Sequence, residues 1–411
     1  MNWIRRIAYS SILFKPFLKL FYYRWNKRFD LKEGFLSGDG LKQYLGPAQW
    51  FQYHGEEEVN FSLPVTTKTD LPKQIEFYAG HSFKVSAGEV YFFDTAFLMG
   101  PNAVGVTVDG QIILDTAMDL PNVLHKCSPR LLMNYKRVRE EVCYDHVISL
   151  VHLFCNSHYV NYFHWVCDSI LLVEGAQAYE RKFGIRIKLI VNDNLKIFQK
   201  EYLKYLGYEE DDLILWKDHK KARVNHLVVA KSRRTGTNMD EIVSPQGMIW
   251  LAKSLVHKFQ KKNSRFGNRI FLTRQHGDCR RIVNYEEILP VLEKFGFQIV
   301  NADELNVAEQ IGLFSKMQVL CAPHGAGLTN MIFSSRLKIL ELIGNVDKPG
   351  DFQWYCAYYS MSQALGHDYS FMVGITIPLL KPLKTKQIYD LSIDPVDLDQ
   401  HLKWLVDGFG R

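Results

Sequence analysis

The sequence predicts an α/β protein whose two Rossmann-like domains face a cleft, with a β-rich portion ahead of them. Residues 145–230 and 269–343 each alternate short apolar strands with helical segments, a pattern typical of right-handed parallel sheets. Residues 231–238 are polar and lack apolar periodicity, so we interpret them as the linker between the two blocks. We therefore expect a ligand cleft between the halves, because domain interfaces commonly bind ligands.

The β-rich portion spans residues 55–120, where strand-type runs alternate with turn residues. Asp109-Gly110, followed by an apolar run, predicts a hairpin. The expected strands of this portion are residues 61–65, 74–78, 90–93 and 103–108. In the alternating blocks, the expected helices include residues 162–182, 194–206, 285–295, 305–316 and 325–333.

These patterns divide the chain into four parts. They are a basic amphipathic segment, an acceptor-side domain that combines the β-rich portion with the first alternating block, a Rossmann-like donor-binding domain, and a tail. In this order they cover residues 1–50, 51–235, 236–375 and 376–411. The tail holds a capped helix over residues 394–409, which could pack back on the N-terminal domain.

Composition narrows the class of protein. The 411 residues suffice for two or three domains. An apolar content of 47% and a charged content of 23% are typical of a soluble globular protein. The seven cysteines are odd in number and form no CxxC pair, which favours reduced thiols in a cytosolic protein over a disulfide framework.

The basic charge is concentrated at the N-terminus. The first thirty residues hold seven basic residues and one acidic residue, and so carry a net charge of +6. This equals the net charge of the whole chain. The rest of the chain is neutral on balance, so no nucleic-acid partner is predicted. The longest uncharged run there has eight residues, whereas a spanning helix needs about 20. We expect a cytoplasmic protein whose residues 1–28 contact the anionic inner face of a membrane; the alternative is a basic helix packed on its own protein.

A strand-to-helix turn in the second block is the first candidate site. An apolar run ends at Pro323 and is followed by His324, Gly325, Ala326 and Gly327, after which an apolar helix begins. Small residues let a ligand approach the backbone, and the free N–H groups of a helix start bind anionic oxygen. The turn therefore predicts a phosphate site, and a tight turn without a ligand is the alternative.

Two arginines accompany this turn. Arg274 stands at the end of a predicted strand and Arg281 lies in the following loop, so both could converge on one anion. The planar guanidinium grips phosphate with two parallel hydrogen bonds. The alternative is a pair of solvated arginines. Asn284 could join this site or act as a helix N-cap.

A helix in the first block carries a polar stripe. Asn161, His164 and Asp168 share one face of an otherwise apolar helix. His164 and Asp168, four residues apart, could form a base with an orienting carboxylate. The alternative is a satisfied core histidine.

The sequence lacks the motifs that mark several common cofactor and metal sites. Asn330 stands where GxGxxG requires its third glycine, and no P-loop is present. His152, His158 and His164 are spaced by six and no HExxH occurs, so no metal is predicted. The one DxD motif, Asp397 to Asp399, lies where the C-terminal helix is expected to begin. We interpret its aspartates as acidic residues that stabilise the helix start and not as metal ligands. We expect no cofactor.

Several segments together closely resemble the signature of glycosyltransferase family 61. In chain order they are Leu272-Thr-Arg274, Arg281-Ile-Val-Asn284, Ala308-Glu-Gln310, Pro323-His-Gly-Ala-Gly-Leu-Thr-Asn330 and Glu341-Leu-Ile343. The resemblance covers about residues 145–345. The His164 to Asp168 segment is similar to the upstream helix of the family, less strictly. At Tyr285 the chain departs from the family, where an acidic residue often follows the asparagine.

The resemblance implies a GT-B fold, a nucleotide-sugar donor, and inversion at the anomeric carbon without an obligatory metal. Gly325, Ala326 and Gly327 would then present N–H groups to the diphosphate. Arg274 and Arg281 would neutralise the leaving group, with Asn284 beside them. The remaining expected donor contacts are His324, Thr329 and Asn330 to phosphate or sugar, and Glu341 to a ribose hydroxyl or the sugar.

The first half would bind the acceptor, with His164 or Asp168 as the base. We thus expect an inverting glycosyltransferase that moves a sugar from a nucleotide-sugar donor, with UDP as the expected nucleotide, to a glycan or lipid-linked glycan in surface polysaccharide synthesis. Two alternatives stay open: a nucleotide-sugar-binding protein without turnover, and a Rossmann-type oxidoreductase.

Overall fold

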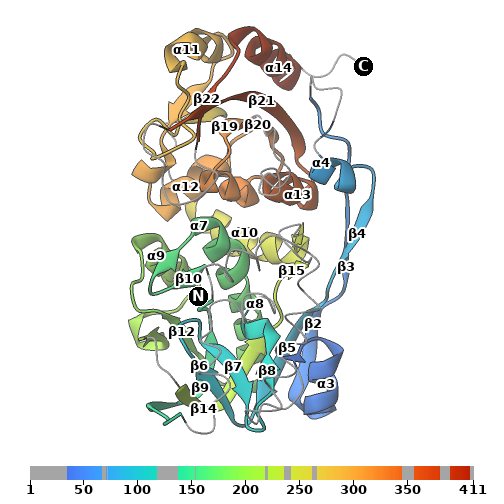
Figure 1. Cartoon of the computed structure of the whole chain (residues 1–411), viewed down its shortest axis with the longest axis vertical. Coiled ribbons are helices and arrows are strands. Elements are labelled where there is room, and N and C mark those ends of the chain that lie inside the picture. Colours follow the sequence, from blue (N-terminus) through green and yellow to red (C-terminus); the bar gives the residue numbers. More distant parts are fainter. Residues whose placement is uncertain are drawn as a thin grey trace.

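The computed structural model describes most of the chain beyond residue 34. The described residues are 35–66, 71, 73–117, 138–152, 154–217, 221–235, 242–261, 266–344, 356–379 and 389–407. The predicted membrane-contacting segment, residues 1–28, lies outside them. Figure 1 shows an elongated molecule with one sheet in its lower half and another in its upper half. Among the described helices, none has the length and hydropathy needed to cross a membrane.

The lower half is built on a ten-stranded sheet in the order β1-β8-β7-β6-β14-β9-β12-β13, with β5 also pairing with β14 and β2 with β5. The strands β14, β9, β12 and β13 run parallel, whereas β5 and β6 are antiparallel to β14. Its strands are β1 (Phe35–Leu36), β2 (Trp50–His54), β5 (Gly88–Phe93), β6 (Ala96–Met99), β7 (Val104–Thr107), β8 (Ile112–Ile113), β9 (Val142–Ser149), β12 (Lys188–Asn192), β13 (Leu213–Trp216) and β14 (Lys221–Ala230). This half is a mixed sheet, not a purely parallel one.

The upper half holds a six-stranded sheet in the order β18-β17-β19-β20-β21-β22, parallel except for β22. Its strands are β17 (Arg269–Leu272), β18 (Gln298–Val300), β19 (Val319–Pro323), β20 (Lys338–Gly344), β21 (Asp368–Pro378) and β22 (Tyr389–Ser392). Its helices include α11 (Tyr285–Lys294), α12 (Val307–Phe314), α13 (Cys356–Ala364) and α14 (Pro395–Asp407). The protein is thus of mixed α/β class, as the sequence predicts.

The expected helix over residues 162–182 is interrupted. Helix α7 (Tyr162–His164) passes into η4 (Trp165–Ile170), a π-helical turn, and then into α8 (Leu172–Phe183). Such π turns occur frequently at functional sites. Helices α9 (Ile197–Tyr205) and α10 (Pro245–Phe259) also belong to this part of the fold, and Figure 1 shows α7 and α10 at the top of the lower half, beneath α12.

Two expected strands are wrong. Residues 73–78 form helix α4 (Lys73–Tyr78), and residues 61–65 contribute only one isolated bridge, from Val65 to Ser370. Local strand propensity is overridden by tertiary packing. This stretch, with β3 (Glu57–Asn60) and β4 (Ser82–Val85), forms an arm that leaves the lower half and reaches the upper half along one side of the molecule (Figure 1).

Aromatic packing anchors the arm. Phe61 stacks on Tyr78 with ring centroids 4.8 Å apart and meets the edge of Tyr359 in α13 at 5.4 Å. Ser62 donates from both its amide and its hydroxyl to Gln363 of the same helix. Residues that were expected to belong to the acceptor-side domain therefore pack on the upper half.

The tail helix also differs from expectation. Helix α14 packs on α11 and β20 of the upper half, and Leu398, Leu402 and Leu405 join Phe271 and Ile288 in one apolar cluster. The reason is its apolar face, which covers the upper sheet locally. The expected return to the N-terminal domain is not what the structure has.

The two halves share one core. A single cluster of buried side chains includes Trp165 and Leu171 of the lower half with Leu328 and Met331 of the upper half.

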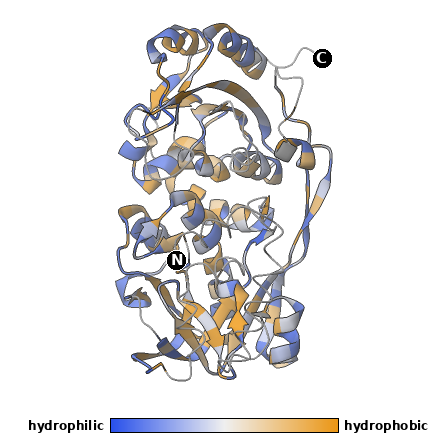
Figure 2. Ribbon diagram, in the orientation of Figure 1, coloured by the Kyte–Doolittle hydropathy of each residue, from blue (hydrophilic) through white to orange (hydrophobic). Residues whose placement is uncertain are grey.

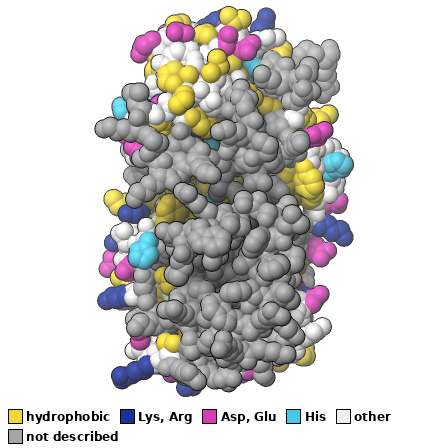
Figure 3. Space-filling model, in the orientation of Figure 1, with side chains coloured by type: hydrophobic (Ala, Val, Ile, Leu, Met, Phe, Trp, Pro, Cys, Tyr) yellow, Lys and Arg dark blue, Asp and Glu magenta, His cyan; other side chains and the backbone are white. Residues whose placement is uncertain are grey.

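Figure 2 shows hydrophobic residues concentrated on strands such as β7 and β8. Among the described side chains at the outline of Figure 3, basic and acidic groups lie interspersed, in keeping with a chain that is near neutral beyond its first thirty residues.

We predict that the arm stabilises the fold through Phe61. Phe61→Ala should lower the free energy of unfolding by about 3–5 kcal/mol, because a buried ring is lost and a cavity is left. Phe77→Ala is the matched control, since Phe77 lies in the same arm but is 57% exposed; it should cost at most about 1 kcal/mol. Urea unfolding followed by fluorescence measures both, and equal losses would contradict this assignment.

Candidate functional site

A pocket opens at the carboxyl ends of strands β17 and β19, the edge of a parallel sheet where ligands bind. Its space is about 490 Å³, part of it open to solvent. The residues that line it are Leu272, Thr273, Arg274, His276, Gly277, Asn301, Ala302, Asp303, Ala322, Pro323, Gly325, Gly327 and Leu328. The predicted residues Arg274, Gly325 and Gly327 are thus brought together here, while Asp303 and His276 are lining residues that the sequence analysis did not single out.

At Gly325 the side chain of Arg274 closely approaches the backbone. Its φ of 175° is an ordinary extended value, but a Cβ atom at this position would lie 2.4 Å from Nη1 of Arg274. The guanidinium therefore lies directly over the turn. A Cβ at Gly327 would meet nothing closer than Leu272 at 3.6 Å. The glycine that makes room for a cation is Gly325.

The helix after the turn is a 3₁₀ helix, η7 (Ala326–Phe333), where an α-helix was expected. Its first bond runs from the Leu328 amide to the Gly325 carbonyl, at 3.0 Å. A helix of either kind leaves the N–H groups of its first turn without partners inside the helix. The backbone N–H groups of Ala326 and Gly327 therefore still belong to a helix start beside Arg274.

His324 belongs to a buried hydrogen-bonded group. Its Nδ1 contacts Oε1 of Glu341, and Tyr369 donates to Oε2 of the same carboxylate at 2.6 Å. Burial lowers the pKa of His324, although Glu341 opposes this shift. Glu341 is fully buried in β20 and does not line the pocket. In this structure the Glu341 carboxylate orients His324. It does not line the pocket in which a ribose could bind.

The neighbouring arginines point in different directions. Arg280 adopts a φ of 60° and donates from Nη1 to the carbonyl oxygen of His324 at 3.1 Å. Arg281 instead pairs with Asp390 through Nε and Nη2, at 3.0 and 2.6 Å. Arg281 does not line the pocket. Arg280, which the sequence analysis passed over, is the arginine that accompanies Arg274 at the turn.

Asn284 anchors the tail. Its amide donates to the carbonyl oxygen of Ile393 and accepts from the Ile393 amide, at 2.8 and 3.0 Å. It occupies the N-cap position of α11, yet its side chain makes no capping bond. Asn284 therefore neither lines the pocket nor caps α11 with its side chain. Its hydrogen bonds to Ile393 instead fix the chain ahead of α14.

Thr329 and Asn330 are fully buried in η7. Asn330 accepts a hydrogen bond from the hydroxyl of Tyr162 at 2.6 Å and donates to Oε1 of Gln310, also at 2.6 Å. Tyr162 is the first residue of α7. Both ends of the Asn330 amide are thus engaged by protein partners, and they tie the turn to the helix that carries His164.

His164 and Asp168 form the dyad that their spacing predicts. Nδ1 of His164 lies 2.6 Å from Oδ2 of Asp168. Asn161 caps α7 by accepting from the His164 amide at 3.2 Å, so the third residue of the polar stripe positions the histidine. An ionised carboxylate only accepts hydrogen bonds, so Nδ1 carries the proton and Nε2 is left as the basic nitrogen.

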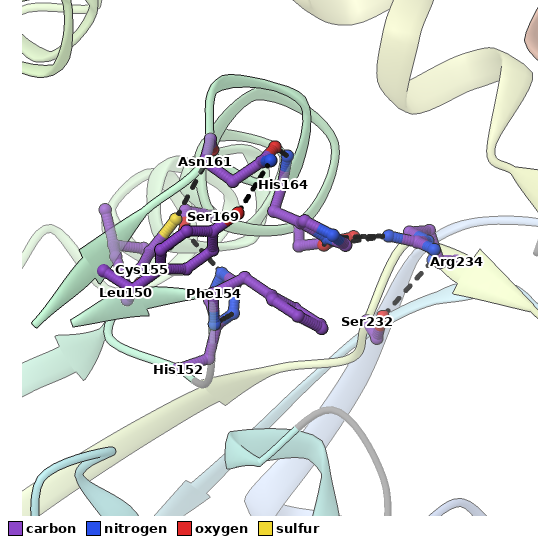
Figure 4. Close-up of polar contacts among 11 residues, drawn as sticks. Leu150, His152, Phe154, Cys155, Asn161, His164, Ser169, Ser232 and Arg234 are labelled. Atoms are coloured by element: carbon purple, nitrogen blue, oxygen red, sulfur yellow. Dashed lines mark hydrogen bonds and ion pairs between the residues drawn. The ribbon is translucent and has the colours of Figure 1, made fainter. Parts of the chain in front are cut away.

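Arg234 completes the dyad. Its Nη1 donates to both oxygens of Asp168 at 2.9 Å and lies 3.3 Å from Nδ1 of His164. Figure 4 shows its side chain reaching toward His164 from the segment that carries Ser232. Burial alone would raise the pKa of Asp168, but Arg234 and His164 outweigh it and lower the pKa to about 2. Asp168 is therefore an ionised, enclosed carboxylate and a poor base.

The expected linker thus contributes buried, ion-paired side chains to the fold. Arg234–Thr235 form strand β15, which pairs with β16 (Ile242–Val243), and Arg233 is buried with 2% exposure. Buried arginines need carboxylate partners, and these lie on other elements: Asp168 for Arg234, and Glu57 for Arg233. A polar stretch without periodicity carries no signal of such distant partners. Residues 236–238 of this segment lie outside the described residues.

The environment of His164 suits a base. Its ring stacks on Phe154 with centroids 3.9 Å apart. Burial lowers its pKa, while Asp168 partly opposes this shift, so the imidazole is neutral at pH 7. His152 offers the contrast of a satisfied core histidine, because both its nitrogens are bonded, to Ser169 and to the Phe154 amide.

The two histidines lie on either side of one aromatic pair. The ring of Phe163 meets that of His164 at 5.2 Å and that of Tyr358 at 5.8 Å. Tyr358 in turn meets His324 at 5.1 Å. A chain of ring contacts through Phe163 and Tyr358 therefore connects His164 in the lower half with His324 in the upper half.

Comparison with known proteins agrees with this geometry. A family model described as Glycosyltransferase 61 matches residues 162–338, a range that contains His164, Asp168, Arg234, Arg274 and the turn. The chain is also 36% identical over 69 residues to alpha-1,3-arabinosyltransferase XAT3 of Oryza sativa subsp. japonica. That match covers 16% of this chain and only 12% of the rice protein. The region that carries both the dyad and the turn is therefore similar to glycosyltransferase family 61.

Proposed function

We propose that this protein is an inverting, metal-independent glycosyltransferase of the GT-B type, in which a nucleotide-sugar donor binds the upper half and a glycan acceptor binds the lower half. One observation carries the proposal: a neutral histidine held by a buried carboxylate lies across an aromatic pair from a pocket with arginines at a helix start. A base and an anion site on opposite halves are what transfer between two substrates requires.

The donor diphosphate would occupy the pocket beside the turn. Arg274 lies over Gly325, and Arg280 contacts the carbonyl of His324. The N–H groups that begin η7 add a partial positive charge. Negative charge grows on the leaving diphosphate as the glycosidic bond breaks, and preorganised donors stabilise that charge in the transition state. UDP is the nucleotide we propose, and it is the first to test.

The acceptor hydroxyl would lose its proton to His164. Nε2 takes the proton while the acceptor oxygen forms a bond to the anomeric carbon. The bond from that carbon to the diphosphate oxygen breaks, and the electron pair leaves with the nucleoside diphosphate. One direct displacement inverts the anomeric configuration. Asp168 and Arg234 hold the imidazole in the required tautomer, and Asp168 stabilises the imidazolium that forms.

The acceptor and the location are further parts of the proposal. We propose a glycan or lipid-linked glycan of a surface polysaccharide as acceptor, at the cytoplasmic face of a membrane. The support is the basic, apolar composition of residues 1–28. A liposome flotation assay with and without these residues tests it, since equal flotation would contradict membrane contact.

Loss of the base should slow transfer without loss of donor binding. His164→Asn should reduce kcat by about 10²–10⁴-fold, measured as release of nucleoside diphosphate from a panel of nucleotide sugars with acceptor present. His257→Asn is the matched control, because His257 is an exposed histidine on α10 that contacts only its own helix. Near wild-type turnover of folded His164→Asn would reject the role of His164. If the wild-type chain binds nucleotide sugars but shows no turnover, the non-catalytic alternative gains support.

The same base sets the pH dependence. The folded pKa of His164 lies below its ordinary value of 6.5, so the neutral form predominates at pH 7. We expect kcat/KM to be level near pH 7 and to fall only below about pH 6.5, as His164 takes up a proton. The acid limb should vanish from the residual activity of His164→Asn. A limb that persists unchanged in this variant would place the titration on another group.

Donor binding should depend on Gly325 through Arg274. In Gly325→Ala, the new methyl displaces the guanidinium that lies 2.4 Å from its position. We expect the Kd for UDP to rise about tenfold or more, as in Arg274→Ala, because charged hydrogen bonds contribute roughly 1.5–3 kcal/mol. Gly267→Ala is the control, since its methyl would meet nothing closer than Gln298 at 3.6 Å. Calorimetry measures all three, and unchanged binding by both Gly325→Ala and Arg274→Ala would contradict the proposed diphosphate site.

Asp303 should bind the ribose. It lines the pocket just after β18, where an acidic side chain accepts from ribose hydroxyls in nucleotide-binding α/β folds. Asp303→Asn should weaken UDP binding by about tenfold but leave the affinity for the matching deoxyribose nucleotide nearly unchanged. The neighbouring Glu304→Gln is the control, because Glu304 bonds Asn301 and does not line the pocket. Equal losses for UDP and for both its 2′-deoxy and 3′-deoxy forms would contradict this role.

A further inference from the structure

A second group of ligand-type side chains lies in the lower sheet, apart from the pocket. It consists of Asp145 and His146 on β9 and His226 on β14, and its donor atoms all lie within 4.8 Å of one another. We infer that these three residues bind a divalent transition metal ion, with Zn²⁺ as the best match for two imidazoles and one carboxylate. We call this group the cross-strand site.

The two histidines are brought together by strand register. β9 and β14 are parallel neighbours, and His146 is the register partner of His226. Register partners on adjacent strands project to the same face of the sheet. Their rings accordingly stack, with centroids 4.1 Å apart and planes 20° from parallel. The backbone ladder thus fixes two imidazoles side by side.

The third ligand comes from the residue before His146. Oδ2 of Asp145 lies 3.2 Å from Nδ1 of His146. In a tetrahedral zinc site with Zn–N distances of 2.0–2.1 Å, ligand atoms lie roughly 3.4 Å apart. Because the donor atoms lie within 4.8 Å of one another and the two imidazole rings are stacked, metal binding requires the side chains to rotate until their donor atoms converge on one ion.

The surroundings give a metal access. Asp145 is exposed, and both histidines are half-buried. β12 pairs with β9 only from Val147 onward, so the stretch of β9 that bears the two ligands extends beyond this neighbour. Three protein ligands leave a fourth position for water or for a further ligand.

The cross-strand site is distinct from the proposed chemistry. Its residues belong to the β9–β14 pair in the lower sheet, whereas the pocket lies on the upper sheet (Figure 1). β14 also pairs with β5 and β6, so it is the strand where the antiparallel and parallel parts of the sheet meet. A metal bound across β9 and β14 would stabilise that junction, since a ligand that binds only the folded state shifts unfolding.

The test uses the full chain freed of metal by a chelator that is then removed. Zn²⁺ is titrated by calorimetry, and Co²⁺ is titrated by visible absorption, in which tetrahedral binding with nitrogen ligands gives d–d bands. We expect one ion per chain and a rise in Tm with Zn²⁺. His226→Ala and His146→Ala should each weaken binding at least tenfold, and Asp145→Asn should weaken it less.

Matched controls separate this site from other donors. His257→Ala removes a surface histidine elsewhere, and Cys143→Ser removes an exposed thiol on the same strand; neither should change the affinity. Tm without metal shows whether each variant folds. Absence of Zn²⁺ binding by the wild-type chain, or wild-type Zn²⁺ affinity in folded His226→Ala and His146→Ala, would overturn the inference.

Discussion

The buried carboxylate of Asp168 is the group on which the organisation of this molecule depends. A carboxylate with a 3% exposed side chain needs charged partners, because an uncompensated buried charge is strongly destabilising. Arg234 meets this need from a segment 66 residues further along the chain. The pair ties the π turn to β15, and it leaves Asp168 ionised, so that His164 carries its proton on Nδ1 and leaves Nε2 basic.

The same helix start connects the two halves. Tyr162 donates to Asn330, and Phe163 contacts Tyr358, so the two residues that precede His164 reach the upper half. The arm through Phe61 adds a second connection from the β-rich portion to α13. Because one apolar core runs through both halves, His164 and the pocket beside Gly325 hold defined positions relative to each other.

Local patterns predicted much of this arrangement. The alternation of strands and helices, the dyad at a spacing of four residues, and the turn at Gly325 all follow from short-range periodicity and spacing. What escaped prediction depends on distant partners. Gln74 to Tyr78 reads as a strand but forms a helix, because it packs within the arm on α13. Arg280 and Arg281 are indistinguishable in sequence, and only the backbone at Arg280 turns one toward His324 and the other toward Asp390. The cross-strand site escaped a search for sequence-local metal motifs because its ligands come from strands 80 residues apart.

The central claim is that Asp168 and Arg234 hold His164 as a neutral imidazole with its basic nitrogen at Nε2. The most direct measurement is nitrogen NMR of the chain labelled with ¹⁵N-histidine at pH 7, with His164 assigned from the His164→Asn variant. The account predicts a protonated Nδ1 and an unprotonated Nε2 for this residue, and loss of that tautomer preference in Asp168→Asn. A protonated Nε2, or a fully protonated imidazolium at pH 7, would contradict it.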